Sequence, residues 1–116
     1  RCFEKFADTF SPKIVAEPNG QVVMLVRCEG DKVPWHAHAS EDEMFLVLDG
    51  VLEVQERRGT VTLHAGEMYV VERGTEHRVV PHGHVKLMLF EPAGIEHTGK
   101  VEAEITRKRF DRLGPG

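Results

Sequence analysis

The chain has 116 residues, the length of one domain, and carries a net charge of -4 with acidic and basic residues interspersed. The lack of a basic stripe argues against a nucleic-acid partner, and no apolar run approaches the roughly 20 residues that a membrane helix needs. The two cysteines, Cys2 and Cys28, form no disulfide framework, and no signal peptide is visible in a chain that starts at Arg1. We therefore expect a single domain over residues 1–116, in the cytoplasm, with no membrane contact.

The N-terminal end of the chain is the one part with helical spacing. Apolar residues recur there at the interval of an α-helix, at Phe3, Phe6, Ala7 and Phe10. A proline at position 12 ends the pattern. A short helical segment is therefore predicted over residues 3–10.

The rest of the chain has the pattern of strands. Short apolar or alternating runs recur at even spacing and are separated by turn residues, as in a sandwich or barrel. The predicted strands are Gln21–Cys28, 44–48, 51–57, 60–64, 68–72, 77–80, 85–90 and 101–107. Asp49-Gly50 predicts a hairpin turn, and His82-Gly83-His84 predicts a solvated hairpin loop. Residues 113–116 are expected to form a loose tail, and the whole pattern predicts an all-β jelly roll or barrel.

The segment between Gly30 and Gly50 contains the pattern of a metal site. His36 and His38 are two residues apart, so on an extended segment their side chains project from the same face. A turn over residues 39–42 brings Glu43 back to the same place, and His77 is a candidate fourth ligand. Three imidazoles and one carboxylate suit a divalent transition metal. The residues leave its identity open among Zn, Mn, Fe and Ni.

These residues resemble the two motifs of the small single-domain cupins. The first motif sets two histidines and a glutamate between two glycines at fixed gaps, and its places are filled by Gly30, His36, His38, Glu43 and Gly50. The second motif, over residues 66–81, is matched at Gly66, Gly74 and His77. It departs at Glu72 and Pro81, where the family has proline and asparagine. These departures affect turn and packing positions rather than ligands.

The resemblance implies a cupin double-stranded β-helix, a jelly-roll barrel, that holds one metal ion at the four candidate ligands. The segments 11–17, 90–94 and 97–99 resemble a subgroup of compact cupins often labelled mannose-6-phosphate-isomerase-like, a label that rests on fold rather than function. Cupins include isomerases, dioxygenases, decarboxylases and non-enzymatic binders. The resemblance therefore does not choose a reaction.

Three residues are candidates for the wall of a substrate pocket. If Glu43 points into the barrel, Phe45 points inward too, and it either lines a pocket near the metal or packs in the core. Trp35 lies beside His36 and is either a rim residue or a half-buried strand aromatic. His97 belongs to a loop that is able to approach the barrel mouth. Solvated strand ends or loops are instead expected for His64, His82 and His84.

Two classes of function fit such a site. The first is an enzyme acting on a small oxygen-rich molecule that chelates the ion, either an isomerase with Zn or Mn or a dioxygenase with Fe or Ni. The second is a non-catalytic small-molecule-binding module, which the lack of a clear general base favours. A phosphate substrate needs a cationic cluster near the metal, and Arg78 and Lys86 are poorly placed candidates. Neither cysteine falls in a motif, so no protein nucleophile is expected.

The parity of residues 43–48 also predicts a homodimer. With Glu43 pointing inward, Met44, Leu46 and Leu48 point outward, and all three are apolar. A strand that is apolar on both faces needs cover on both. Either a partner subunit covers the outer face, or the phenylalanines of residues 3–10 form a local lid. Closed two-fold dimers are the commonest oligomers.

Overall fold

The computed structural model describes residues 2–92 and 111–112, and nearly all regular structure in this part is β-strand. His97, the strand predicted over residues 101–107 and the tail at residues 113–116 lie outside the described residues. The elements are η1 (Cys2–Lys5), β1 (Lys13–Ala16), η2 (Pro18–Gly20), β2 (Gln21–Cys28), β3 (Glu43–Glu56), β4 (Gly59–His64), β5 (Met68–Val71), β6 (His77–Pro92) and β7 (Asp111–Arg112). The predicted all-β fold is confirmed. In this part of the chain, no helix is long and apolar enough to cross a membrane.

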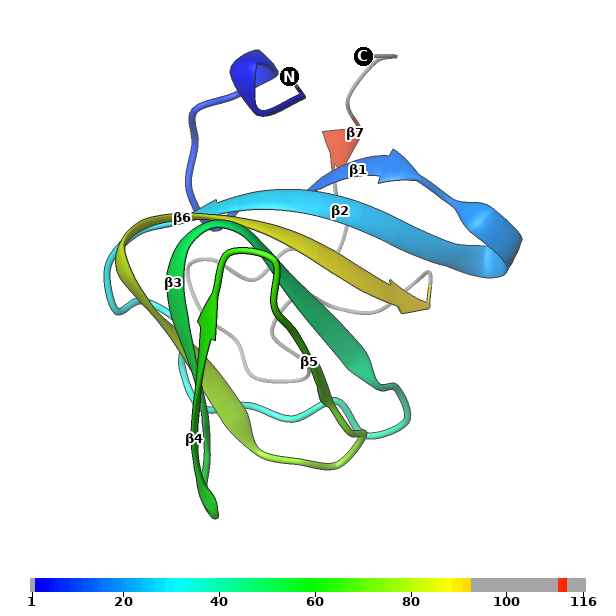
Figure 1. Cartoon of the computed structure of the whole chain (residues 1–116). Helices are drawn as coiled ribbons and strands as arrows, with labels where there is room; N and C mark the ends of the chain where they lie inside the picture. Colours follow the sequence, from blue (N-terminus) through cyan, green and yellow to red (C-terminus); the bar gives the residue numbers. More distant parts are fainter. Residues whose placement is uncertain (1, 93–110, 113–116) are drawn as a thin grey trace.

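The strands form one curled sheet in the order β4-β3-β6-β2-β1-β7, with β5 also paired to β3. The long strands β3 and β6 pair antiparallel over most of their length. One end of β3 pairs with β5 and the other with β4. Figure 1 shows β3 and β6 curving as they run from the part of the sheet beside β2 to the part beside β4. The sheet thus folds over on itself and encloses a core.

The two predicted hairpins in the middle of these strands are wrong. Asp49-Gly50 lies inside β3, and His82-Gly83-His84 lies inside β6, so each glycine marks a bend in a continuous strand. Gly50 has φ 92°, and a Cβ there would lie 2.8 Å from the carbonyl oxygen of His84. The glycine therefore allows two strands to pass closely and does not reverse the chain.

Burial along β3 shows what the bend does. Before it the odd-numbered residues are buried, as in Phe45 and Val47, and after it the even-numbered ones are, as in Leu52 and Val54. The pairing register with β6 shifts on both sides of Asp49. An extra residue in one strand flips the side chains that follow to the other face. Both halves of β3 therefore contribute to one core, and the parity expected for residues 43–48 is confirmed by their burial.

The N-terminal segment is less helical than its spacing predicts. A 3-10 helix covers Cys2–Lys5 only, and Phe10 has a left-handed φ of 54°. The phenylalanines have different partners, which is why no common helical stripe forms. The ring of Phe3 lies against the guanidinium of Arg27, whereas Phe10 packs in the main core and its amide donates to the carbonyl of Arg27. Strand β1, which follows, was not predicted, because Lys13 begins it and is buried.

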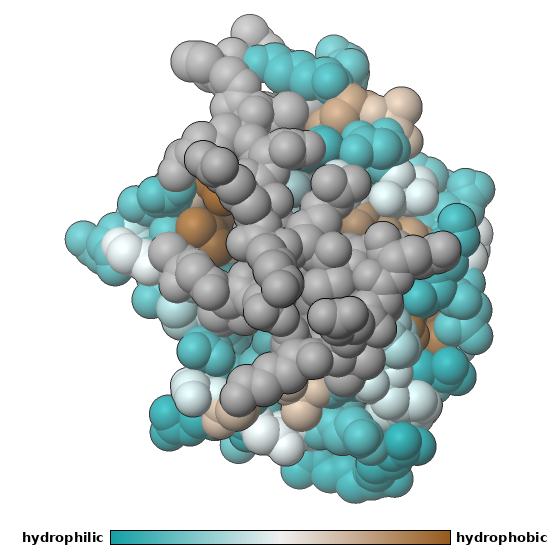
Figure 2. Space-filling model, turned by 180° about the vertical axis from the view of Figure 1, so that it is seen from behind, coloured by the Kyte–Doolittle hydropathy of each residue, from teal (hydrophilic) through white to brown (hydrophobic). Residues whose placement is uncertain are grey.

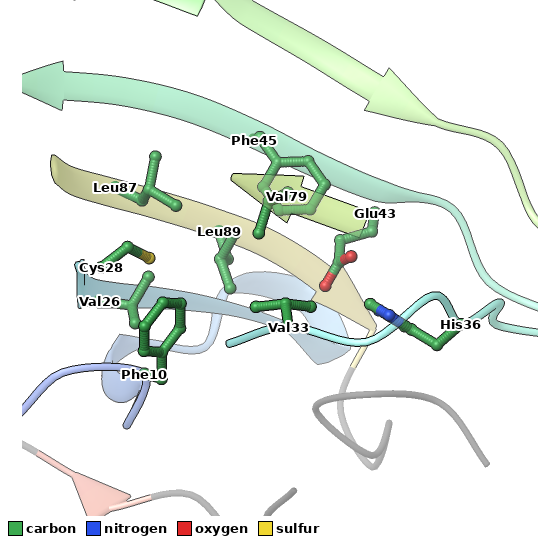
Figure 3. A pocket seen from close by; sticks show the side chains of 10 residues that line it. All are labelled: Phe10, Val26, Cys28, Val33, His36, Glu43, Phe45, Val79, Leu87 and Leu89. Carbon is green, nitrogen blue, oxygen red and sulfur yellow. The ribbon is translucent and has the colours of Figure 1, made fainter. Parts of the chain in front are cut away.

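The core fills the space between the folded halves of the sheet. It contains a small cavity between β2, β6 and the first residues of β3, lined mainly by apolar side chains (Figure 3). On the face opposite that of Figure 1, hydrophilic side chains cover most of the described surface, and apolar ones appear only in small separate patches (Figure 2). The apolar side chains are thus largely inside, as the strand pattern predicts.

Candidate metal centre

Two short backbone contacts position the candidate ligands. His36 and His77 form an antiparallel bridge, in which the amide of each donates to the carbonyl of the other at 2.9 and 2.8 Å. The amide of Gly74 donates to the carbonyl of His38 at 2.7 Å. The segment between β2 and β3 is thereby tied to the turn that precedes β6. Since Glu43 is the first residue of β3, all four candidates meet at one end of the barrel.

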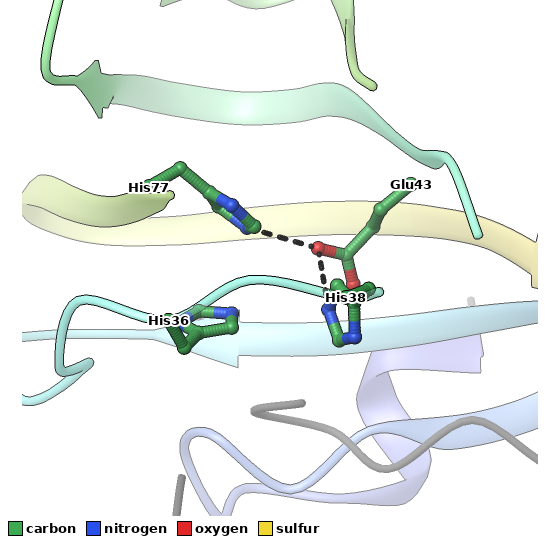
Figure 4. Close-up of side chains that lie close together, drawn as sticks. All are labelled: His36, His38, Glu43 and His77. Atoms are coloured by element: carbon green, nitrogen blue, oxygen red, sulfur yellow. Dashed lines mark ion pairs between the residues drawn. The ribbon is translucent and has the colours of Figure 1, made fainter. Parts of the chain in front are cut away.

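The structure brings together all four residues that the sequence nominates. His36, His38, Glu43 and His77 are all buried, and their potential ligand atoms lie within 4.8 Å of one another. Glu43 Oε1 is 3.5 Å from His38 Nε2 and 3.4 Å from His77 Nε2 (Figure 4). The rings of His36 and His77 have centroids 4.4 Å apart. Such a group of donors is compact enough to surround one ion.

The hydrogen bonds of two imidazoles leave their inner nitrogens available. Nδ1 of His36 lies 2.8 Å from the carbonyl oxygen of Pro34, and Nδ1 of His77 lies 2.9 Å from that of Thr75. Because a carbonyl only accepts, each Nδ1 carries the proton, and Nε2 keeps its lone pair when the ring is neutral. Backbone carbonyls commonly orient metal-binding histidines in this way.

The inner nitrogens face the Glu43 carboxylate without forming a hydrogen bond. Among the described residues, Nε2 of His38 and Nε2 of His77 are fully buried and make no hydrogen bond. Burying a polar atom without a partner is costly, and a metal ion would supply the missing partner. Nitrogen and carboxylate donors in this number suit a divalent transition metal. The residues present therefore fit the ion that the motif implies.

The ionisation of the cluster matches that role. Burial, followed by the neighbouring His77, lowers the pKa of His36 to about 4, so its imidazole is neutral at ordinary pH. Burial by itself would raise the pKa of Glu43, but contacts with His38 and His77 outweigh it and hold the pKa below its usual range. Burial would lower the pKa of His77, and the Glu43 carboxylate reverses this and raises it. The site thus offers a charged carboxylate and, at His36, a neutral imidazole.

A fifth titratable residue, Glu91, was missed by the sequence analysis. It is 1% exposed, and neither of its carboxylate oxygens has a hydrogen-bond partner within the described part of the chain. The pairing of Met44 with Phe90 continues one step to set Glu91 beside Glu43 on the inner face. Burial and then the charge of Glu43 raise the pKa of Glu91. The alternation of side chains along the strand could have predicted its position, because Leu87, Leu89 and Glu91 all point inward.

The candidate pocket residues have different surroundings. Phe45 is buried, lines the cavity, and meets the ring of His77 edge-on at a centroid distance of 6.2 Å. Trp35 is half-buried, and its ring is covered by the guanidinium of Arg57, whose Cζ lies 3.7 Å from the centroid. Trp35 is therefore a half-buried aromatic near the surface, but it lies in the connection between β2 and β3 rather than in a strand. His97 lies outside the described residues.

The histidines that were set aside do not join the cluster. His64, His82 and His84 are all exposed. His82 is paired with the carboxylate of Glu53, and Nε2 of His84 lies 3.5 Å from a guanidinium nitrogen of Arg27. All three therefore lie at the surface, although His82 and His84 are on a strand rather than in the loop that was predicted.

Comparisons with known proteins agree with this geometry. A family model described as "Cupin domain" matches residues 23–91. A cupin-2 domain containing protein from Shewanella frigidimarina NCIMB 400 is 41% identical, with a TM-score of 0.75 over 78% of this chain and 87% of that one. The hydroquinone 1,2-dioxygenase PnpCD, in complex with Cd²⁺ and 4-hydroxybenzonitrile, is 22% identical, with a TM-score of 0.69 over 81% of this chain and 72% of that one. This second likeness shows the fold alone.

A sequence relative is also found in Bacillus subtilis strain 168, the uncharacterized protein YdbB. It is 34% identical over 65 residues, which make up 55% of this chain and 57% of that protein. The match thus spans a little over half the length of the relative.

Proposed function

Because this chain belongs to the cupin domain family, we propose that it binds one divalent transition-metal ion through His36, His38, Glu43 and His77. The observation that carries this proposal is the convergence of four buried donor groups within 4.8 Å, two of whose nitrogens have no other partner in the described chain. Unrelated histidines and acids rarely gather in a core, because each buried polar group needs a partner.

We further propose that the protein is an enzyme acting on a small oxygen-rich molecule that binds through two oxygens, such as a diketone, an enediol or a hydroxy-acid. When bound, a divalent ion supplies Lewis acidity, and its remaining coordination positions are open to substrate. The carbonyls of Pro34 and Thr75 hold two imidazoles in orientation. Glu91 provides a second carboxyl group next to Glu43, in position to hold a proton.

Two reaction types remain within this proposal. Isomerisation fits Zn or Mn with a nearby proton carrier, and dioxygenation fits Fe or Ni. The fold shared with a dioxygenase supports the second type only at the level of architecture. A phosphate-bearing substrate is not proposed, because Arg78 lies at the surface with Gln55 and Asp31 rather than beside the ligands.

Elemental analysis of protein purified without an affinity tag tests the metal. About one equivalent of a single transition metal is expected by the one-ion geometry, and its loss in His77→Ala, but not in His64→Ala, would tie it to this site. Calorimetric titration of chelator-stripped protein with Zn²⁺, Mn²⁺, Fe²⁺ and Ni²⁺ gives the affinities. Uptake that is unchanged in His77→Ala would contradict the proposal.

The activity itself is tested with a panel of diketones, enediols, hydroxy-acids and sugars, with oxygen consumption and product formation both followed. The alternative is a non-catalytic binding module. It is favoured by one observation: apart from two of the ligands, the described residues that line the cavity beside the metal centre are all apolar, so they offer no general base. Binding of a panel member without turnover, by metal-loaded protein, would select the binding module.

We also propose that the protein is a homodimer, paired through an outer apolar face. Strand register places Met44 beside Val70 and Phe90, and Leu46 beside Met68 and Met88. Alternation along β3 adds Leu48, so the face consists of Met44, Leu46, Leu48, Met68, Val70, Met88 and Phe90. The first two are half-buried, while Leu48, Met68 and Val70 are 43, 55 and 41% exposed. None of the seven is charged, so two-fold pairing of this face with its own copy would bury apolar surface without burying a charge.

Sedimentation at micromolar concentration tests the dimer. A species of twice the chain mass is expected, and Leu46→Arg should convert it to a monomer. Thr62→Arg, on the exposed part of β4, is the matched control and should leave the dimer intact. A wild-type protein that sediments as a single chain would end this proposal.

A further inference from the structure

The core cavity lies directly beside the candidate metal centre. Its volume is about 30 Å³, and it is lined by Phe10, Val26, Cys28, Val33, His36, Glu43, Phe45, Val79, Leu87 and Leu89. Figure 3 shows these side chains projecting toward a common space between β2, β3 and β6, with His36 and Glu43 at one end and Cys28 and Phe10 toward the other. The cavity is thus an elongated space that starts at two of the four ligands.

The cavity lies next to the position of the ion but does not include it. All four donors surround the point where an ion would bind, but only His36 and Glu43 line the cavity. The eight other lining residues are apolar if the Cys28 thiol is counted as a small hydrophobe. Val26 and Leu87 are each 1% exposed, so the part of the cavity that they line is deep in the core. The cavity is therefore an apolar side chamber of the metal centre.

The size of the chamber restricts its occupant. A site for one water-sized particle needs about 10–15 Å³ by the same measure. The chamber therefore has room for about two such particles, or one molecule of two heavy atoms. A diketone or a sugar is far too large. Away from His36 and Glu43, water is also a poor occupant, since a buried water needs two to four polar partners and apolar cavities stay dry. A small apolar diatomic molecule meets both limits.

The lining offers no reactive group of its own. Burial raises the pKa of Cys28 to about 12, so its thiol stays protonated and is a poor nucleophile. Among the described residues that line the chamber, the only charged or metal-binding groups are His36 and Glu43. Whatever occupies the chamber is therefore positioned by shape and apolar contact, next to the place where the ion would bind.

We propose that this chamber is a binding site for dioxygen beside the metal centre. The inference rests on the proposed metal-dependent function and deepens it, because a gas site next to the ligands favours oxygenation over isomerisation. The organic substrate then approaches the ion from elsewhere.

Dioxygen is paramagnetic, so its binding is measured directly, without turnover, in chelator-stripped protein. Methyl relaxation rates are compared under nitrogen and under raised dioxygen pressure. Methyl groups of Val26, Leu87 and Leu89 should relax several-fold faster under dioxygen than those of Val22 and Leu52, which are equally buried but do not line the chamber. Equal effects on both groups would overturn the proposal.

A matched pair of variants on β2 sharpens the test. Val26→Ile adds one methylene group to the chamber, and Val22→Ile adds the same group to a core position outside it. The first should reduce the dioxygen effect on Leu87 and Leu89 to the level of Leu52, and the second should leave it unchanged. If Val26→Ile does not fold, Cys28→Val fills the same end of the chamber. Dioxygen effects that survive filling, or an ordered water in the chamber in a crystal structure, would overturn the proposal.

Metal titration of the same variants keeps this test apart from that of the proposed function. Val26→Ile should bind the ion as tightly as the wild type, since the four donors are untouched. A wild-type protein that takes up dioxygen but no metal would end the metal-dependent function, while the gas site would stand. A protein that takes up metal but shows no preferred dioxygen site would keep the function and end this inference.

Discussion

His36 and His38 lie in the interior with a carboxylate beside them, whereas His82 and His84 have the same spacing but lie on the surface. The inner pair is fixed by backbone bonds to a second segment that brings His77. The outer pair flanks a left-handed glycine at the bend of β6, and its members have separate partners in Glu53 and Arg27. Spacing alone therefore does not make a metal site. The position of the pair relative to a second segment does.

Metal affinity should separate the buried ligands from the outer pair most strongly. Loss of groups that merely orient a ligand typically costs 10–100-fold in affinity, so His38→Ala or His77→Ala should cost more than about 100-fold. His82→Ala and His84→Ala should leave the dissociation constant unchanged. Isothermal titration of the four variants checks this. Equal losses in both pairs would remove the distinction.

The pH dependence of metal binding should come from the buried histidines and not from the outer pair. A proton competes with the ion for each imidazole. The pKa of His36 is lowered to about 4, but that of His77 is raised, so His77 is the first to be protonated as pH falls. Affinity should therefore begin to fall at or above pH of about 6.5, by about tenfold per pH unit for each competing proton. His82→Ala should give the same profile, and metal uptake that is constant down to pH 5 would argue against histidine ligation.

Near the outer pair, the glycines at the strand bends should contribute more to the free energy of unfolding than the two histidines do. Gly50→Ala should destabilise the protein by about 2 kcal/mol or more, because a left-handed φ of 92° and a Cβ 2.8 Å from the His84 carbonyl both oppose it. Gly83 also has a left-handed φ, of 69°, but no atom lies within 4 Å of an added Cβ. Gly83→Ala should therefore destabilise the protein by only about 1 kcal/mol. Urea denaturation measures both. Equal costs would mean that the two strands do not pass as closely as described.

Two acids on these strands should respond to pH with opposite signs. The pKa of Glu91 is raised in the folded protein, so its contribution to stability declines as pH rises above its unfolded value. Glu91→Gln should therefore stabilise chelator-stripped protein at pH 8 by about 1–3 kcal/mol, and less at pH 5. The pKa of Glu53 is lowered by His82, so its contribution is present at neutral pH and is lost in acid. Glu53→Gln should be slightly destabilising at pH 8. Thermal melts at the two pH values compare the variants.

The sequence predicted the parts of this protein that depend on local pattern. The glycine frame and His-x-His spacing located the four candidate ligands, and alternation located the inward residues of the first half of β3. The prediction failed at Asp49-Gly50. This dipeptide is found both in hairpin turns and, as here, at a bend where two strands pass closely, and the sequence alone does not distinguish the two. It also passed over Glu91, because an acid after an apolar strand resembles the start of a loop until the neighbouring strand is known.

Glu43 opens β3 and His77 opens β6, and in the antiparallel ladder these residues belong to opposite ends. They meet only because both strands bend, so an ion held between them would act as a cross-link that closes the chain from residue 36 to residue 77. Unlike a disulfide, such a link exists only in the folded chain, because the unfolded chain does not gather the four donors. The free energy of binding the ion therefore adds to the free energy of unfolding. Ion release and barrel opening would then be one event, and the residence time of the metal would report how often the two halves of the sheet part.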